Sequence, residues 1–218
     1  MELIKLEDVS KAYTGSEEPV LKNTNLCVRG GEYLSIKGVS GSGKSTLLFI
    51  LGGLLVPTTG KVLFQGQDVS SLKDNELSVW RGKHVGYLFQ NIQMAQALTV
   101  RENMILARKF GNDKDADIEE MIQILGLEEV ADKLPGHLSG GQKRRAMIGC
   151  VLIRKPQVIL ADEPTNDLDS EWAEKIMTFL RNQIQSERAL ILVTHDPRWA
   201  DTAPVRYSIS DGKLTREQ

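Results

Sequence analysis

The 218-residue chain contains few cysteines, few aromatic residues and no long hydrophobic segment. Its two cysteines, Cys27 and Cys150, lack the CxxC spacing of metal or redox sites, so we expect two buried, reduced thiols. The longest apolar run, residues 47–56, is interrupted by glycines and falls short of the ~20 residues of a membrane-spanning helix. The N-terminal stretch MELIKLEDVS alternates like a strand and not like a secretory signal. These absences indicate a protein of the reducing cytosol.

A strong excess of one charge is also missing. The chain has 27 Lys and Arg residues against 29 Asp and Glu residues, for a formal net charge of −2. Proteins that hold nucleic acid by its phosphates are usually basic, so we expect no nucleic-acid partner. The basic run QKRR, residues 142–145, is interpreted as the partly solvated start of a helix.

The first third of the chain and the helical segment that we expect later in it differ in their pattern of apolar and polar residues. Short alternating segments separated by glycine turns predict strands over the first sixty or so residues, including a small antiparallel portion. From about residue 91 to residue 137 the periodicity predicts a mostly helical segment, with apolar residues at i, i+3, i+4 and i+7: Ile118, Met121, Ile122 and Leu125. We therefore expect a single domain over residues 1–218, with this helical segment inserted into an α/β core.

Two later runs, PQVILAD and RALILVTHD, are short apolar segments flanked by turn residues. Such runs are typical of strands that are buried on both faces of a parallel sheet. The segment between them is amphipathic at helical spacing, with Ser170 as a plausible N-cap. A strand, helix and strand in this order predict an α/β sheet.

The stretch GVSGSGKST, residues 38–46, fits the pattern GxxxxGK[ST] and lies between the strand YLSIK and the helical STLLFILGG. In this context the glycines let backbone N–H groups surround phosphates at a helix N-terminus. Lys44 would reach the β- and γ-phosphates, and the Ser45 hydroxyl would ligate Mg²⁺. We therefore expect a nucleoside triphosphate site formed by Gly38, Ser40, Gly41, Ser42, Gly43, Lys44, Ser45 and Thr46.

Two adjacent carboxylates end the apolar strand VILADEP. At a strand end in such a protein, Asp162 is suited to hold Mg²⁺, directly or through a water, and Glu163 could activate the water that attacks the γ-phosphate. A lone histidine is more often structural than catalytic, but His195 ends a second buried strand at the same sheet edge, which favours a catalytic role. Gln90 closes the strand-like HVGYLFQ, and its amide could reach the metal or the water.

A final motif, LSGGQ at residues 138–142, has two adjacent glycines and no nucleophile or acid beside them. Together with the preceding motifs, in this order and spacing, it resembles the ATP-binding cassette (ABC) ATPases over essentially the whole chain. Small-molecule kinases share the phosphate loop and the acidic strand end but lack this motif. The resemblance implies a P-loop NTPase core with an antiparallel β subdomain and a helical subdomain.

The resemblance also implies how the site works. In the family, two cassettes pair head to tail around two ATP molecules, and the signature of one subunit completes the site of the other. The implied contacts to the partner's γ-phosphate come from Ser139, Gly140, Gly141 and Gln142. Tyr13 is implied to stack on adenine, with ordinary packing as the alternative.

Within the family, the chain is most similar to the bacterial lipoprotein-releasing, macrolide-export and antimicrobial-peptide-resistance branch. This implies an ATP-hydrolysing subunit, cytoplasmic and peripheral on the inner face of the cell membrane. Its partners would be a second copy or a paralogous cassette, and a polytopic membrane subunit. The chain departs from the branch at Asn166-Asp167, where Gly-Asn is usual, in the residues after Gln90, and at Cys150, where arginine is common.

Two alternatives remain at the sequence level. A soluble ABC ATPase that remodels the ribosome or another cytosolic machine is favoured by Asn166, but such factors carry two cassettes in one chain, and this chain has one phosphate loop and one signature. A nucleotide sensor or scaffold without turnover is disfavoured by Glu163 and His195.

Overall fold

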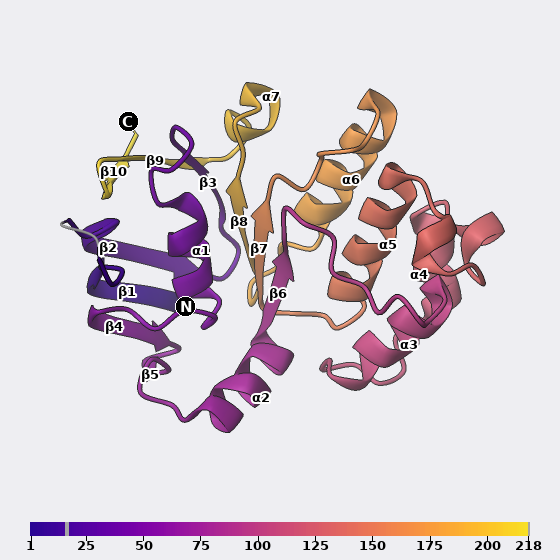
Figure 1. The fold of residues 1–218 in the computed structure, drawn as a ribbon, viewed down its shortest axis with the longest axis horizontal. Coiled ribbons are helices and arrows are strands. Elements are labelled where there is room, and N and C mark those ends of the chain that lie inside the picture. The colour runs from indigo at the N-terminus through magenta and orange to yellow at the C-terminus, as the bar shows by residue number, and fades with distance from the viewer. Residues whose placement is uncertain (16–17, 218) are drawn as a thin grey trace.

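The computed structural model describes residues 1–15 and 18–217 (Figure 1). The strands are, in chain order, β1 (Glu2–Lys11), β2 (Leu21–Arg29), β3 (Tyr33–Lys37), β4 (Thr59–Phe64), β5 (Gln67–Asp68), β6 (Val85–Leu88), β7 (Val158–Asp162), β8 (Ala189–Val193), β9 (Val205–Ser210) and β10 (Lys213–Arg216). The helices are α1 (Lys44–Leu51), α2 (Asp74–His84), α3 (Val100–Lys109), α4 (Ile118–Ile124), α5 (Gly140–Leu152), α6 (Ser170–Asn182) and α7 (Pro197–Ala200), with short 3₁₀ turns η1 (Glu128–Val130) and η2 (Pro135–His137).

Within the described residues the strands form two sheets. The smaller has the order β2-β1-β4-β5 and is antiparallel. The larger has the order β10-β9-β3-β8-β7-β6, and its strands pair in parallel except for β10, which is antiparallel to β9. The parallel arrangement brings the carboxyl ends of β3, β7 and β8 to one edge of the sheet, where open α/β sheets bind their ligands. The predicted α/β class with a small antiparallel portion is confirmed.

The central strands are buried on both faces. On β8, Leu190 and Leu192 pack into a core with residues of α5 and α6, whereas Ile191 and Val193 pack into a second core with α1 and the antiparallel sheet. Figure 1 shows this division, with α5 and α6 on one side of the parallel strands and α1 on the other. Burial on both faces explains why this strand reads as a continuous apolar run.

The chain between β6 and β7 is mainly helical, and local signals define its helix ends. Asp117 caps α4 by accepting hydrogen bonds from the N–H groups of Glu119 (2.8 Å) and Glu120 (3.1 Å). Gly126 follows this helix with a φ of 58°, a left-handed conformation that glycine adopts without strain. Helices α3 and α4 both pack on α5, which carries the signature at its start.

Three sequence-based expectations need correction. Asp169, not Ser170, caps α6: its carboxylate accepts from the N–H of Trp172 at 2.8 Å, and Ser170 is the first helical residue. Both residue types are good caps, and only the extended backbone of Asp169 decides between them. The sequence analysis assigned no helix to α2, where only Leu77 and Trp80 are buried.

The third correction concerns the cysteines. Cys27 and Cys150 are free thiols, but both are only partly buried rather than buried. Among the helices of residues 1–15 and 18–217, none is long and apolar enough to traverse a bilayer.

Candidate nucleotide-binding site

A cleft of about 500 Å³ opens at the carboxyl edge of the parallel strands. Its walls come from the loops that follow β1, β3, β6, β7 and β8, so residues far apart in the sequence meet there. The lining consists of Tyr13, Val20, Gly38, Ser40, Gly41, Gly43, Lys44, Ser45, Thr46, Gln90, Asp162, Glu163, Asn166 and His195. The structure therefore brings together most of the site residues predicted from the sequence.

The loop between β3 and α1 forms one wall of the cleft. Gly43 precedes α1 with a φ of 104°, a conformation that favours glycine, and lets the chain turn directly into the helix. The Nζ of Lys44 donates hydrogen bonds to the carbonyls of Gly38 and Val39, both at 2.8 Å, and so lies across its own loop. Of the predicted loop residues only Ser42 is absent from the lining; it is buried, and its hydroxyl has no hydrogen-bond partner among the described residues.

The acidic pair at the end of β7 divides between two environments. Asp162 is 7% exposed and accepts a hydrogen bond from the Ser45 hydroxyl at 3.2 Å. Burial raises the pKa of the Asp162 carboxyl, because a low-dielectric surrounding disfavours the charged form, and the nearby charge of Glu163 acts in the same direction. Asp162 is thus a carboxylate whose charge the surrounding protein does not fully compensate.

Glu163 has a φ of 49°, which turns its backbone out of the strand direction. Its carboxylate accepts hydrogen bonds from the Thr194 hydroxyl (2.8 Å) and from the backbone N–H of His195 (2.8 Å). The Nδ1 of His195 lies 2.6 Å from the same carboxylate. A carboxylate only accepts, so Nδ1 carries the proton in this contact. Glu163 and His195 are therefore joined by direct hydrogen bonds. Thr194, which the sequence analysis did not single out, orients the Glu163 carboxylate through its hydroxyl.

Tyr13 and Asn166 border the same cleft. The Tyr13 hydroxyl lies 3.2 Å from the hydroxyl of Thr46, and the ring is 42% exposed. Its exposure leaves a ring face available for stacking. Asn166 was noted in the sequence only as a departure from a family pattern, and its position on the wall of the cleft was not predicted.

The LSGGQ residues do not take part in this cleft. Ser139 caps α5, where its hydroxyl accepts from the N–H of Gln142 at 3.2 Å and its own N–H donates to the Gln142 side chain at 2.9 Å. None of the four predicted signature residues is among the described residues that line the cleft: Ser139, Gly140, Gly141 and Gln142. Within one chain, the phosphate loop and the signature are therefore separate surfaces.

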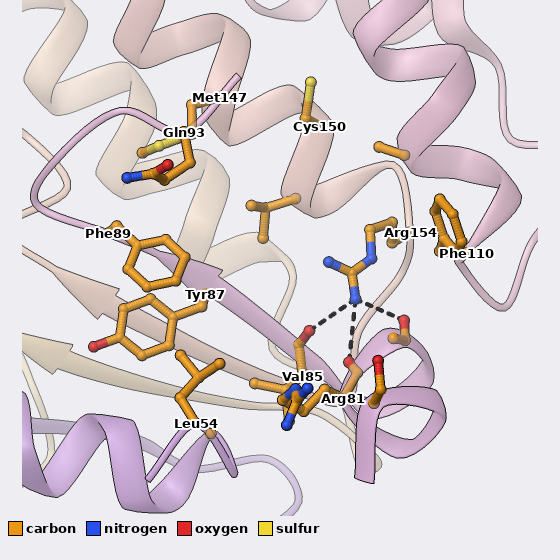
Figure 2. Close-up of a pocket in the computed structure, with 15 residues that line it drawn as sticks. Leu54, Arg81, Val85, Tyr87, Phe89, Gln93, Phe110, Met147, Cys150 and Arg154 are labelled. Carbon is orange, nitrogen blue, oxygen red and sulfur yellow. Dashed lines mark hydrogen bonds between the residues drawn. The ribbon is translucent and has the colours of Figure 1, made fainter. Parts of the chain in front are cut away.

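A second hollow, a groove of about 480 Å³, lies between α2, β6, α3 and α5 (Figure 2). Its lining includes Leu54, Phe89 and Phe110 together with two arginines. Arg154 donates through one nitrogen to the carbonyls of Arg81 (3.1 Å), Gly82 (2.6 Å) and Val85 (3.0 Å), the three dashed contacts of Figure 2. No acidic side chain is among the described residues that line this groove.

The fold and the cleft together define a P-loop ATPase of the cassette type. The family model described as ABC transporter matches residues 21–166, and the chain belongs to this family. It is an ABC transporter ATPase cassette. The family expected from the phosphate loop and the LSGGQ motif is confirmed.

Two curated relatives differ in how much of their length this chain represents. The macrolide export ATP-binding/permease protein MacB of Salmonella paratyphi A is 40% identical over 97% of this chain, but the chain spans only 34% of that protein. The ABC transporter ATP-binding protein YtrE of Bacillus subtilis is 38% identical over 94% of this chain and 91% of that protein. The chain thus spans about a third of the length of the first relative.

Two solved structures are similar in fold over nearly the whole chain. The dimeric post-hydrolysis state of the ATP-binding cassette MJ0796 bound to ADP and Pi has a TM-score of 0.91 at 36% identity, covering 99% of this chain and 98% of that chain. A dimeric structure of MJ0796, a bacterial ABC transporter cassette, has a TM-score of 0.89 at 37% identity, with the same coverage. These similarities confirm the cassette fold.

Proposed function

We propose that this cassette hydrolyses ATP in a composite site shared with a second cassette and drives a membrane subunit, and that it acts at the cytoplasmic face of the cell membrane. The observation that carries the proposal is that the cleft residues and the signature lie on separate surfaces of one chain. Lys44, Asp162, Glu163 and His195 gather in one cleft, whereas Ser139 lies outside it. A site divided in this way is completed by a second copy or by a paralogous cassette.

In the proposed mechanism the loop of residues 38–46 holds the triphosphate. Its backbone N–H groups and the N-terminus of α1 attract the phosphate oxygens, and Lys44 exchanges its contacts to Gly38 and Val39 for the β- and γ-phosphates. Tyr13, partly exposed on the cleft wall, stacks on the base. The two carbonyls that Lys44 now contacts keep its ammonium close to the position of the phosphates.

Mg²⁺ fits the oxygen groups at the end of β7. The Ser45 hydroxyl and the Asp162 carboxylate lie 3.2 Å apart, and magnesium prefers hard oxygen ligands of this kind. The buried Asp162 would gain the positive charge that it lacks, and Gln90, which follows the neighbouring strand β6 and lines the same cleft, would reach the metal or the attacking water. When bound, the ion would neutralise charge that develops on the phosphates.

Glu163 is the proposed general base. Its carboxylate already accepts one hydrogen bond from Thr194 and two from His195 (backbone N–H and Nδ1), and a carboxylate has about four lone-pair positions, so one position remains for a water. These contacts hold the carboxylate in one orientation, which general-base catalysis requires. His195 is a positioning and proton-holding group at the same carboxylate.

The signature of the second cassette completes the site in this proposal. Ser139, Gly140 and Gly141 would present a hydroxyl and the N–H groups of the first turn of α5 to the γ-phosphate bound by the other chain. The two dimeric MJ0796 structures support this pairing. The absence of an acidic residue in the LSGGQ stretch fits this role, because the general base in this proposal is Glu163 of the other chain.

The groove between α2, β6, α3 and α5 is the proposed contact for a membrane subunit. Leu54 (45% exposed) and Phe110 (61% exposed) offer apolar surface there, and Arg81 and Arg154 give the groove a positive charge without an acidic partner in its described lining. An amphipathic segment of a membrane protein would match this surface. The name of the MacB relative, an ATP-binding/permease protein, supports a membrane partner of this kind.

The test is a pull-down of tagged Glu163→Gln protein with ATP from detergent-solubilised native membranes. We expect a polytopic membrane protein in a stoichiometric amount. Leu54→Asp should abolish its recovery, whereas the matched control Val56→Asp, which changes an apolar residue of similar exposure (54%) outside the groove lining, should not. Recovery of ribosomal proteins would instead favour the soluble remodelling ATPase, and recovery of the cassette alone would contradict the membrane role.

A further inference from the structure

Arg144 lies in the first turns of α5 and is only 1% exposed although it carries a charge. Its guanidinium donates hydrogen bonds to the backbone carbonyls of Phe89 (Nη1, 2.8 Å) and Gln90 (Nη2, 2.6 Å). It also donates to the carbonyl of Asn166 (Nε, 3.2 Å) and to the carboxylate of Asp167 (Nη2, 3.1 Å). All three nitrogens of this buried cation are therefore satisfied.

The acceptors belong to two loops that border the ATP cleft. Phe89 and Gln90 follow β6, and Asn166 follows β7, and the side chains of Gln90 and Asn166 both line the cleft. Phe89 faces the other way: its ring lines the groove and stacks on Tyr87 with a centroid separation of 4.1 Å. One buried side chain on α5 thus joins the groove wall and two walls of the ATP cleft.

Among the described residues, Asp167 is the acidic side chain that pairs with Arg144, and it differs from Arg144 in exposure. Its side chain is 53% exposed, against 2% for the side chain of Arg144. Its backbone has a φ of 66°, and a Cβ built on Gly141 would lie only 3.0 Å from the Asp167 carbonyl oxygen. The loop of Asp167 therefore touches the N-terminal turn of α5 and is tied to the same helix again through Arg144.

We propose that Arg144 is a positioning residue for ATP hydrolysis, which holds the Gln90 loop and the Asn166-Asp167 loop in register with helix α5, with Asp167 as its exposed counter-ion. A planar guanidinium presents five N–H donors on three nitrogens in a fixed fork, whereas an ammonium presents three donors from a single nitrogen. Without it, carbonyls in both loops lose their hydrogen-bond donor, and neither loop is held to helix α5 through this side chain. The effect on hydrolysis would then come from geometry, since Arg144 does not line the cleft.

The adjacent Arg145 provides a matched control. It is also buried (8% exposed) and also donates to backbone carbonyls, at Leu125 and Gly126, while its guanidinium stacks 3.9 Å from the Trp172 ring. These contacts lie away from the cleft lining. Arg145→Gln removes a buried guanidinium from the same helix without touching either loop.

The experiment compares steady-state ATP hydrolysis, ATP affinity and Tm for Arg144→Gln and Arg145→Gln. We expect both variants to lose stability. Only Arg144→Gln should lower kcat, by about tenfold or more, while the Kd for ATP stays within about twofold, because misplacement of catalytic groups affects the chemical step more than binding. A wild-type kcat in folded Arg144→Gln, or parallel losses in both variants, would overturn the proposal.

Two further variants keep the test decisive if Arg144→Gln does not fold. Arg144→Lys retains the charge but replaces the fork by a single ammonium, and it should also reduce kcat at unchanged ATP affinity. Asp167→Ala removes the half-exposed counter-ion and leaves the carbonyl contacts in place. We expect it to reduce kcat several-fold in the wild-type protein and to have no further effect in the Arg144→Lys background. Wild-type kcat in Arg144→Lys, or additive effects of the two changes, would contradict the proposal.

The inference rests on the proposed hydrolytic site, and the two can fail separately. Glu163→Gln, measured in the same assay, reports on the site itself. If Glu163→Gln hydrolyses ATP at the wild-type rate, the proposed site is wrong. If Glu163→Gln is inactive but Arg144→Gln is not impaired, only the role of Arg144 is wrong.

Discussion

At the scale of one residue, Asp162 is a buried carboxyl that would bind a cation well but lowers the stability of the cation-free protein. Its carboxyl is buried at the end of β7, its Ser45 contact offsets only part of the desolvation, and burial raises its pKa. An ionised group in this position destabilises the folded state until a cation joins it. Functional sites often contain such groups, and their replacement often stabilises the ligand-free protein.

We therefore expect Asp162→Asn to stabilise the nucleotide-free protein at neutral pH by on the order of 1 kcal/mol, which corresponds to a rise in Tm of roughly 2–4 °C. The same change should remove the stabilisation by magnesium and ATP. The sign follows from the raised pKa. The fold favours the protonated Asp162 carboxyl. The stability that the wild-type protein gains from it is present below the ordinary aspartate pKa and is lost as the pH rises through the raised pKa of Asp162. The difference in Tm between variant and wild type should grow from acidic to neutral pH.

The measurement is thermal unfolding of both proteins over a pH series without nucleotide. Asp201→Asn is a control of opposite sign, because the hydrogen bond from Lys37 lowers the pKa of the Asp201 carboxyl. That carboxylate stabilises the fold above its ordinary pKa, so its loss should lower the Tm slightly at neutral pH. A pH-independent difference for Asp162→Asn would show that the charge of Asp162 is not the cause.

At the scale of one element, helix α5 serves three surfaces of the molecule. Its N-terminal turn carries the signature, Arg144 reaches the two loops of the ATP cleft, and Cys150 and Arg154, at and beyond its end, line the groove. The capping box of Ser139 and Gln142 defines where the helix begins and keeps its first N–H groups directed outward. The same serine is therefore both a structural cap and the proposed ligand of a phosphate on the partner.

Two substitutions of Ser139 separate these roles. Ser139→Ala removes the cap and should cost about 1 kcal/mol of stability with partial loss of activity. Ser139→Arg adds bulk and charge at the proposed interface, so it should bind ATP as a monomer and fail to hydrolyse it. ATP binding, ATPase activity and elution volume are measured for both. Full activity of Ser139→Arg would rule out the shared site. A loss of activity would support it, because the signature residues are not among the described residues that line their own chain's cleft.

At the scale of the whole molecule, the proposed shared site is divided between two separate surfaces of the chain. The cleft holds the phosphate loop, the acidic strand end and His195, whereas the LSGGQ residues lie outside its lining. A head-to-tail dimer would unite the two surfaces twice, which relates ATP binding directly to association. The equilibrium would then shift because ATP makes more contacts in the closed dimer than in the open monomer.

Glu163→Gln should bind ATP with unchanged affinity, hydrolyse it at least about 100-fold more slowly and accumulate as an ATP-bound dimer. The dimer should be visible by size-exclusion chromatography with ATP and should disappear with ADP. Adding Lys44→Ala in the same chain should abolish nucleotide binding and with it the dimer, since the Lys44 ammonium lies across the phosphate loop and lines the cleft. Hydrolysis at the wild-type rate in Glu163→Gln would contradict the general-base role of this residue.

Much of the site could be predicted because its motifs are local. The loop of residues 38–46 and the acidic end of β7 each depend on a few consecutive residues next to a strand, and consecutive residues keep their relation in any fold that preserves the strand. The α/β class followed from the same strands, whose apolar runs reflect burial on both faces. Local periodicity likewise located α4.

The features that were missed depend on contacts between distant segments. Thr194 orients Glu163 across neighbouring strands, Asn166 reaches the cleft wall, and Arg144 is buried because two loops supply its acceptors. The sequence showed Arg144 only as part of a basic run at the start of a helix, for which a solvated surface was the natural interpretation. The sequence by itself determined which groups are proposed to carry the chemistry, since each motif consists of consecutive residues. Only the tertiary structure decided which groups position them, since hydrogen bonds between loops depend on how the sheet brings strand ends together.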